Sequence, residues 1–206
     1  MKVKRKLLVA SGNQGKVREI KNYLKDLSAD LKFEIIAMDS FPELADVIED
    51  GSTFEENALK KARIRAKQTG IASLADDSGL VVDCLDGAPG VYSARYAGEE
   101  ASDDDNNQKL LREVKNYSFQ ERKACFKCVM ALVDPEQDIE IIVKGECHGI
   151  IQLKATGEQG FAYDPLFFLP EKSKTMAELT IEEKNRISHR ANALKAMKKE
   201  VKKRYR

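Results

Sequence analysis

The sequence has little of three things that would narrow its function at once: excess charge of one sign, a long apolar run, and histidine. Its 206 residues hold 35 Lys and Arg against 34 Asp and Glu, so the formal net charge is +1. A balance this close produces no general field that attracts nucleic acid or an anionic membrane surface. We therefore expect no specific nucleic-acid partner, and any bound anion must be held by groups close to it.

The chain has no apolar stretch near the roughly 18 residues that a membrane-spanning helix needs. Its first residues carry positive charge, but the apolar run over residues 7–10 is shorter than the about 7 to 15 residues of an export signal. We expect a cytoplasmic protein with no membrane partner. With only His148 and His189 present, a Ser, His and Asp triad is also disfavoured.

The chain contains four cysteines, and two of them, Cys125 and Cys128, form a CxxC motif that could indicate redox or zinc chemistry. The surrounding segment CFKCVMALV has the apolar, β-branched content of a strand, and a spacing of three places the two thiols on opposite faces. The same alternation separates Cys147 from His148. We expect all four cysteines to be reduced thiols that pack as small apolar side chains.

Segments of strand type and helix type alternate through the first half of the chain, which indicates the α/β class. The expected strands cover residues 3–10, 33–38, 71–75, 124–133 and 139–151. The expected helices cover residues 16–27, 53–69 and 103–114, and a final helix starts at Thr180 with Glu183 as its capping partner. No repeat or linker divides the chain, so we expect one domain over residues 1–206 with two lobes.

The loop SGNQGK, residues 11–16, lies between the first expected strand and its helix. Open α/β sheets bind ligands at this place, and a helix N-terminus offers free N–H groups to a phosphate. The loop is not a P-loop, because two residues rather than four separate Gly12 from Gly15 and Val17 stands where a magnesium-binding hydroxyl would be. A phosphate site and an ordinary turn with a helix cap both remain open.

The stretch LADDSGLVVD, residues 74–83, places two aspartates where the short strand 71–75 is expected to end, with Ser78 and Gly79 in a turn. Asp77 could carry catalysis there, and the segment VIEDGSTFEENA could bring Glu49 or Glu56 close to it. Carboxylates of this kind suit Mg²⁺, which would also offset their repulsion. The alternative is a solvated turn, because Asp and Gly are common turn residues.

The segments GFAYDP (160–165) and KNRISHR (184–190) hold the groups that a planar base would need. Phe161 and Tyr163 can offer a stacking face, and Asp164 can accept a hydrogen bond. The donors are Lys184, His189 and Arg190. On an unbroken helix these three side chains would not share one face, so they would have to reach a ligand from different directions.

Five ordered blocks cover nearly the whole chain: SGNQGK, EDGSTFEENA, LADDSGLVVDCLDGAPGVYSARYAG, GFAYDPLFF and KNRISHRANAL. In this order they closely resemble the inosine triphosphate pyrophosphatase family, also called the Ham1 family, in its bacterial form. The resemblance implies an elongated two-lobed α/β mixed-sheet fold with a central cleft, and a homodimer. It also implies Mg²⁺-dependent hydrolysis of ITP, dITP or XTP to the monophosphate and pyrophosphate, which cleanses the nucleotide pool.

The resemblance assigns roles to particular residues. The triphosphate would be bound by Ser11, Gly12, Asn13, Gln14, Gly15 and Lys16. The metal would be held by Glu49 and Asp77, with Asp77 also accepting the proton of the attacking water. The nucleotide and its base would be contacted by Ser78, Phe161, Ala162, Tyr163, Asp164, Lys184, His189 and Arg190.

The departures from the family pattern are small. Ser11 stands where many relatives have Thr, and Ala162 stands where relatives usually have Gly, which reduces the freedom of that backbone at positive φ. The sequence leaves open which of Asp76 and Asp77 contacts metal and which contacts water.

Two other functions stay open on the residues alone. One is a Maf-like pyrophosphatase for other modified nucleotides. The other is a nucleotide- or RNA-binding module without catalysis, suggested by the basic tail KAMKKEVKKRYR, although a solvated helix end explains the same charges.

Overall fold

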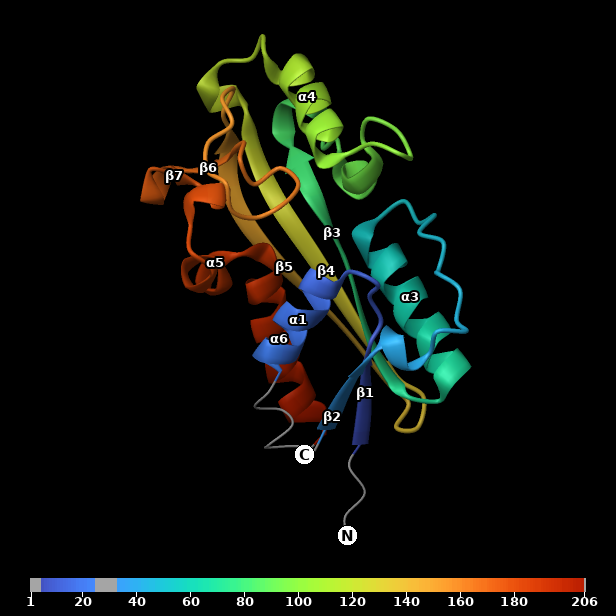
Figure 1. Cartoon of the computed structure of the whole chain (residues 1–206). Coiled ribbons are helices and arrows are strands. Elements are labelled where there is room, and N and C mark those ends of the chain that lie inside the picture. Colours follow the sequence, from blue (N-terminus) through green and yellow to red (C-terminus); the bar gives the residue numbers. More distant parts are fainter. Residues whose placement is uncertain (1–4, 25–32, 206) are drawn as a thin grey trace. The chain divides into compact units, whose positions relative to one another are not determined.

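The computed structural model describes residues 5–24 and 33–205, and its centre is a seven-stranded mixed sheet of order β2-β1-β3-β4-β5-β6-β7 (Figure 1). Its strands are β1 (Arg5–Val9), β2 (Phe33–Ala37), β3 (Ala72–Val82), β4 (Lys123–Asp134), β5 (Ile139–Ile151), β6 (Phe167–Leu169) and β7 (Lys174–Thr175). β1 pairs in parallel with both β2 and β3, whereas β6 is antiparallel to its neighbours. The predicted α/β class is confirmed.

The α-helices of the described residues are α1 (Gln14–Tyr23), α3 (Phe54–Thr69), α4 (Asp103–Val114), α5 (Ile181–Ile187) and α6 (His189–Arg204). A 3-10 helix covers Gly90–Arg95. Within residues 5–24 and 33–205, no helix is both long and apolar enough to cross a membrane. The part of the predicted helix 16–27 beyond residue 24 and the first two residues of the predicted strand 3–10 lie outside the described residues.

The contacts of the chain gather in two compact units. Unit 1 comprises Met1–Asp77, Cys128–Gly145 and Ala191–Arg206, and unit 2 comprises Ser78–Lys127 and Glu146–Arg190. Strands β3, β4 and β5 each contribute residues to both units.

Unit 1 is built in layers, with α1 and α6 on one face of its strands and α3 on the other (Figure 1). Successive side chains of β4 point alternately to the two faces and pack against the helices on each. Met130 and Leu132 are buried among α1 and α6 residues, whereas Val129 and Ala131 pack with the small residues Ala58 and Ala62 of α3 and their neighbours. A period of two along one strand therefore fills two separate cores.

Unit 2 has its own core, in which α4 and the loop before β6 cover the remaining halves of the strands. Leu110 and Val114 of α4 are fully buried there, together with Phe126 of β4 and Tyr163 and Phe167. This core fixes the loop that follows residue 159, which carries several of the predicted base-binding residues.

Most predicted elements agree with the structure to within one or two residues, and α3 shows why. Thr53 and Glu56 form the capping box at its start, and Gly70 ends it in the left-handed conformation with a φ of 68°. The N-cap of α5 at Thr180 also has its predicted capping box with Glu183. These ends are set by local chemistry that the sequence displays.

The prediction for residues 71–79 was wrong. Instead of ending at the aspartate pair and turning at Ser78 and Gly79, β3 continues from Ala72 to Val82. Asp is a poor strand former, but contacts from neighbouring helices satisfy both carboxylates and override that local preference.

The prediction of an unbroken final helix was also wrong. α5 ends at Ile187, Ser188 is extended with φ −62° and ψ 152°, and α6 starts at His189. The residues on either side of Ser188 therefore do not follow one helical repeat.

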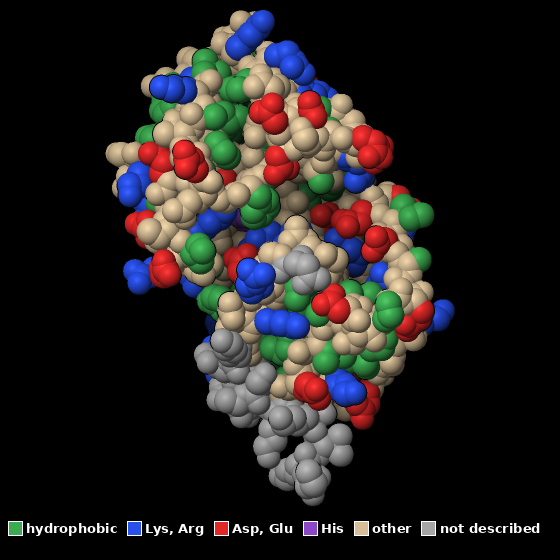
Figure 2. Space-filling model, viewed as in Figure 1, with side chains coloured by type: hydrophobic (Ala, Val, Ile, Leu, Met, Phe, Trp, Pro, Cys, Tyr) green, Lys and Arg blue, Asp and Glu red, His purple; other side chains and the backbone are tan. Residues whose placement is uncertain are grey.

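The cysteines and the surface charges agree with the predictions. All four cysteines are free; Cys128 and Cys147 lie in different cores, while His148, beside Cys147, is exposed. Figure 2 shows acidic and basic side chains interspersed over the visible face, as expected from the net charge of +1.

Candidate active site

The predicted phosphate loop leads from β1 into the N-terminus of α1. Asn13 is the N-cap: its Oδ1 accepts a hydrogen bond from the Lys16 N–H at 3.0 Å. The Ser11 hydroxyl accepts one from the Asn13 N–H at 3.3 Å. The loop is thus both a helix cap and the start of a helix whose first N–H groups can face an anion.

Lys16 reaches from α1 to the neighbouring strand. Its Nζ lies 3.1 Å from Asp76 Oδ2, and the Asp76 side chain is only 2% exposed. Because β1 and β3 are parallel, with Val9 opposite Leu74, the loop after β1 and the aspartate pair come to the same edge of the sheet. The buried carboxylate therefore holds the Lys16 side chain in one orientation.

Asp77 is held from α3 rather than from α1. Asn57 Nδ2 donates to Asp77 Oδ2 at 3.0 Å, and Asn57 Oδ1 accepts from the Gly51 N–H at 2.7 Å. Asn57 is 1% exposed. One buried amide thus connects the acidic segment before α3 to the carboxylate on β3.

The two aspartates have different partners because adjacent strand residues point to opposite faces. Asp76 pairs with α1 and Asp77 with α3, and Figure 1 shows these helices on opposite sides of the unit 1 strands. Their mutual repulsion is reduced, and each carboxylate has its own environment.

Glu49 and Lys61 complete the charges around Asp77. Lys61 Nζ lies 2.8 Å from Glu49 Oε2. Burial is the largest effect on the pKa of Asp77 and raises it above the ordinary value, while Lys61 opposes that rise. The negative charge of Glu49 raises the pKa further, which places Glu49 within electrostatic reach of Asp77.

Glu56, the other acid considered from the sequence, has a structural role. Its Oε2 accepts hydrogen bonds from the N–H groups of Ser52 and Thr53 at 2.7 and 3.2 Å. The Ser52 hydroxyl also donates to this oxygen at 2.8 Å and is the largest cause that lowers the pKa of Glu56, followed by the Ser52 N–H; together these bonds close the cap of α3. Glu49 is therefore the acid that the structure leaves near Asp77.

This set of side chains fits a hard dication. A buried carboxylate whose ionisation is disfavoured by burial and by a second carboxylate gains from a positive charge between the two. Oxygen ligands on one or two carboxylates are also the usual protein contribution to a Mg²⁺ site. Glu49 and Asp77 are the residues that would hold it.

The loop of unit 2 that follows β5 is fixed around Asp164. Its Oδ2 accepts from the Phe161 N–H at 3.0 Å and pairs with Lys184 Nζ of α5. Gly160 has a φ of 96°, and a Cβ there would lie 2.3 Å from Asp164 Oδ2, so only glycine fits this turn.

Phe161 is the exposed aromatic side chain of this loop. Phe161 is 48% exposed. Two cations lie over its ring, with Lys184 Nζ 5.0 Å and Arg190 Cζ 5.8 Å from the ring centroid. A planar base stacked on such a ring would have cationic donors at its edge.

Ala162 adopts a left-handed φ of 52°, which costs a residue with a side chain about 1–2 kcal/mol. Helix α4 holds it there from both sides. Asp103 Oδ2 accepts from the Ala162 N–H at 2.8 Å, and Asn107 Nδ2 donates to the Ala162 carbonyl at 2.9 Å. The backbone strain expected from alanine in place of glycine at position 162 is present, and the hydrogen bonds of Asp103 and Asn107, one helical turn apart, offset it.

Tyr163 does not offer the stacking face that the sequence predicted. It is 1% exposed and packed in the unit 2 core, and its hydroxyl donates to the Ser93 carbonyl at 2.8 Å. Because Phe161 is exposed and two residues away, the loop presents one aromatic ring and anchors itself with the other.

The break at Ser188 resolves the geometric difficulty of the segment 184–190. Lys184 belongs to α5, whereas His189 and Arg190 begin α6 and are buried. The His189 ring stacks on Phe126 with centroids 5.0 Å apart and an interplanar angle of 19°. The extended residue between the helices lets Lys184 and Arg190 both contact Phe161.

Sequence reasoning missed four residues that position this machinery: Asn57, Lys61, Asp103 and Asn107. The first two are one helical turn apart beside the small-residue stripe of α3, and the last two are one turn apart on α4. A polar pair at this spacing next to a buried stripe is the signal that could have indicated them. Ser78, by contrast, is half-buried on β3, and its predicted substrate contact stays a prediction.

Comparison with known proteins identifies the family of the chain. The model of the Ham1 family matches residues 7–200. A dITP/XTP pyrophosphatase of Geobacter sulfurreducens is 52% identical over 193 residues, covering 94% of each chain, and that of Haemophilus influenzae is 47% identical, covering 97% of this chain and all of its own.

Solved structures agree as well. The HAM1 protein of Coxiella burnetii superposes with a TM-score of 0.88 at 42% identity, covering 97% of this chain and 99% of its own. The Staphylococcus aureus Ham1 protein gives a TM-score of 0.87 at 41% identity, covering 96% and 98%. The chain belongs to the Ham1 family.

Proposed function

We propose that this protein is a Mg²⁺-dependent pyrophosphatase that hydrolyses non-canonical purine nucleoside triphosphates, ITP, dITP and XTP, to the monophosphate and pyrophosphate. The carrying observation is the buried Asp77, with a raised pKa, beside Glu49 and within hydrogen-bonding reach of Asn57. Relatives named dITP/XTP pyrophosphatase, 47–52% identical over almost the whole chain, support the substrate class.

In this proposal the residues of unit 1 carry the phosphate chemistry. Bound Mg²⁺ would supply positive charge to the phosphate oxygens. The first N–H groups of α1 offset the negative charge that develops on the phosphate, and Lys16, oriented by Asp76, donates to the phosphate oxygens. Asp77 accepts the proton of the attacking water, and its raised pKa brings it closer to neutral pH, where a general base works best. No covalent intermediate is needed.

The residues of unit 2 select the base. Phe161 provides the stacking surface, and Lys184 and Arg190 beside it provide donors. The 6-keto oxygen of hypoxanthine or xanthine accepts from such donors, whereas the 6-amino group of adenine is itself a donor. Each buried polar group left unpaired costs about 1–3 kcal/mol, so adenine is disfavoured.

The reaction is tested by a panel of ITP, dITP, XTP, ATP, GTP, CTP and dTTP with and without Mg²⁺, in which the products are separated. We expect monophosphate and pyrophosphate from the 6-keto non-canonical purines, and only with metal. Preferred cleavage of modified pyrimidines would favour the Maf-like alternative, and production of diphosphate would refute the assigned bond.

The base assignment has a matched control within unit 2. Phe161→Leu removes the proposed stacking ring, which is worth about 1–3 kcal/mol per base, so KM for ITP should rise about 5- to 150-fold. Phe119→Leu removes another partly exposed ring, which lies 5.7 Å from Arg122 Cζ, and should change KM little. Equal effects of the two substitutions would move the base elsewhere.

The phosphate assignment has its control on the same helix. Lys16→Ala should lower kcat/KM about 10- to 100-fold, equal to about 1.4–2.8 kcal/mol, whereas Arg18→Ala, an exposed cation two residues away, should not. Unchanged kinetics in Lys16→Ala would place the triphosphate at another site.

The resemblance to the Ham1 family also supports a homodimer. Sedimentation of the full chain should give twice the monomer mass of 23.1 kDa. The cytoplasmic location and the absence of a specific nucleic-acid partner stay predictions from composition.

A further inference from the structure

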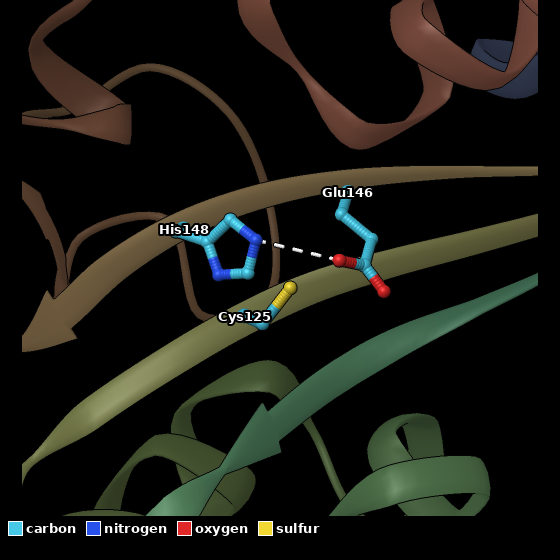
Figure 3. A group of neighbouring side chains, drawn as sticks. All are labelled: Cys125, Glu146 and His148. Atoms are coloured by element: carbon cyan, nitrogen blue, oxygen red, sulfur yellow. Dashed lines mark ion pairs between the residues drawn. The ribbon is translucent and has the colours of Figure 1, made fainter.

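Three side chains with different donor atoms meet on one face of unit 2. Cys125 on β4 and Glu146 and His148 on β5 point toward one another (Figure 3). The Cys125 Sγ, a Glu146 carboxylate oxygen and a His148 imidazole nitrogen all lie within 4.8 Å of one another. None of these residues belongs to the proposed pyrophosphatase site.

The sheet fixes this group. β4 and β5 are neighbouring strands, and Glu146 and His148 are two residues apart, so both side chains leave the same face of β5. The pairs considered from the sequence, Cys125 with Cys128 and Cys147 with His148, are separated by the same alternation. The convergence is created only by the pairing of two strands, which adjacency along the chain does not reveal.

We propose that Cys125, Glu146 and His148 form a binding site for a zinc-like divalent cation, separate from the Mg²⁺ site. A sulfur, an imidazole nitrogen and one carboxylate oxygen are the donor types of zinc sites, whereas Mg²⁺ prefers oxygen alone. Three protein ligands leave a fourth position for water, and the 76% exposed His148 side chain keeps that position open to solvent.

The distances require only small movements. Zinc bonds of about 2.0–2.3 Å in a tetrahedron separate the donor atoms by roughly 3.3–3.8 Å. The His148 Nε2 to Glu146 Oε2 distance is already 3.3 Å. The remaining closure, about 1.5 Å at most from the 4.8 Å limit, falls on the exposed side chains of Glu146 and His148, because Cys125 is buried on its strand. Binding releases the Cys125 thiol proton to solvent and forms a metal–sulfur bond.

One neighbouring charge opposes the cation. Lys127 Nζ lies 3.7 Å from Glu146 Oε1, at the edge of the group. In the absence of metal this exposed ion pair adds little to the stability of the fold. A dication on Glu146 would repel the lysine, so removal of that charge should strengthen binding, which an unrelated surface site would not show.

The experiment uses the full chain, reduced with a phosphine, treated with a chelator, and titrated with Co²⁺ as a spectroscopic substitute for zinc in the presence of excess Mg²⁺. We expect one Co²⁺ per chain with a thiolate-to-cobalt charge-transfer band and tetrahedral d–d bands, both displaced by one equivalent of Zn²⁺. Cys125→Ser should abolish the charge-transfer band. Glu146→Gln and His148→Ala, which change exposed side chains and spare the fold, should each weaken binding at least about tenfold.

The controls separate this site from adventitious binding. Cys84→Ser changes the partly exposed thiol and should leave the titration unchanged, and Lys127→Met should tighten binding several-fold. Absence of a charge-transfer band in the unsubstituted chain would overturn the proposal. So would a band that survives both His148→Ala and Glu146→Gln, or one that disappears in Asp77→Asn, which would assign the bound metal to the pyrophosphatase site.

Discussion

Asn57 provides the sharpest test of how the fold controls Asp77. The perturbation is a pair of substitutions at this one buried position. Asn57→Ala removes both hydrogen bonds of the side chain, the one to Asp77 at 3.0 Å and the one from Gly51 at 2.7 Å. Asn57→Asp keeps an acceptor for the Gly51 N–H but replaces the donor that faces Asp77 with a second acceptor.

The magnitude for Asn57→Ala follows from the burial of its two partners. A hydrogen bond to a charged group contributes about 1.5–3 kcal/mol and a neutral one about 0.5–1.5 kcal/mol. Asp77 is buried, so the full energy of its hydrogen bond is lost, whereas the half-buried Gly51 N–H can replace part of its lost hydrogen bond with water. We expect a loss of about 2–4 kcal/mol in the free energy of unfolding, measured by urea denaturation without metal at neutral pH.

Asn57→Asp should change the pH dependence of activity while it keeps the hydrogen bond from the Gly51 N–H. Two carboxylates at hydrogen-bonding distance cannot both be ionised at little cost, so the pKa of Asp77 rises beyond its already raised position. The acid side of the pH profile of kcat/KM should therefore move to higher pH, and activity at pH 7 should fall. A pH profile identical to that of the unsubstituted enzyme would refute the view that Asn57 tunes Asp77.

Three further predictions follow from individual contacts. The folded-state pKa of Asp77 lies above its ordinary value of 3.8, so the free energy of unfolding falls as the pH rises from 3.8 through the folded-state pKa. Asp77→Asn should therefore abolish turnover yet raise the Tm of the metal-free protein at pH 7, and this gain should vanish below about pH 4. A lowered Tm at pH 7 would contradict this. Tyr205→Phe removes the buried 2.7 Å hydrogen bond to Asp134 and should cost about 1.5–3 kcal/mol in urea denaturation with no change in kcat/KM. Ala162→Gly relieves the positive φ and should stabilise the protein by up to about 1 kcal/mol, whereas a clear loss would show that the strain is absent.

The sequence predicted those elements whose ends are set locally. Helix α3 was predicted within one residue because its capping box, its stripe of small residues and the closing Gly70 are all contiguous in the chain. Strands β4 and β5 were predicted for the same reason: their apolar runs flank a turn in which Asp134 accepts from the N–H groups of Glu136 and Gln137.

The course of β3 could not be predicted, because its determinants are distant in sequence. A strand through two adjacent aspartates is stable only if each carboxylate has a partner, and those partners are Lys16 on α1 and Asn57 on α3. Neither lies within 15 residues of the pair in the printed sequence. Local propensity therefore favoured a turn, and tertiary contacts favoured the strand.

The break at Ser188 left no signal either, since no Pro or Gly lies in the segment KNRISHR. Its causes are contacts within unit 2: His189 is buried against Phe126, while Lys184 is held by Asp164. A continuous helix could not make both contacts, so the chain forms two helices, α5 and α6, separated by the extended residue Ser188. The structure does bring Phe161, Lys184 and Arg190 together, but the sequence did not reveal the helix break that lets them converge, and their role in base binding stays a prediction.

The pairing of Lys16 with Asp76 bears on how the proposed phosphate site would work. A lysine whose charge is matched by a buried carboxylate 3.1 Å away adds little net positive potential to the loop. What the pair supplies is orientation: the side chain loses its freedom on folding rather than on binding, which lowers the entropic cost of holding a phosphate. Net attraction for a triphosphate then falls to the N-terminus of α1 and to the metal. The loss of kcat/KM in Lys16→Ala would therefore have two causes: the missing contact of Lys16 with the phosphate, and repulsion of the substrate by the Asp76 charge that Lys16 no longer offsets. Measuring the effect of Lys16→Ala in an Asp76→Asn protein removes the second cause and so separates the two.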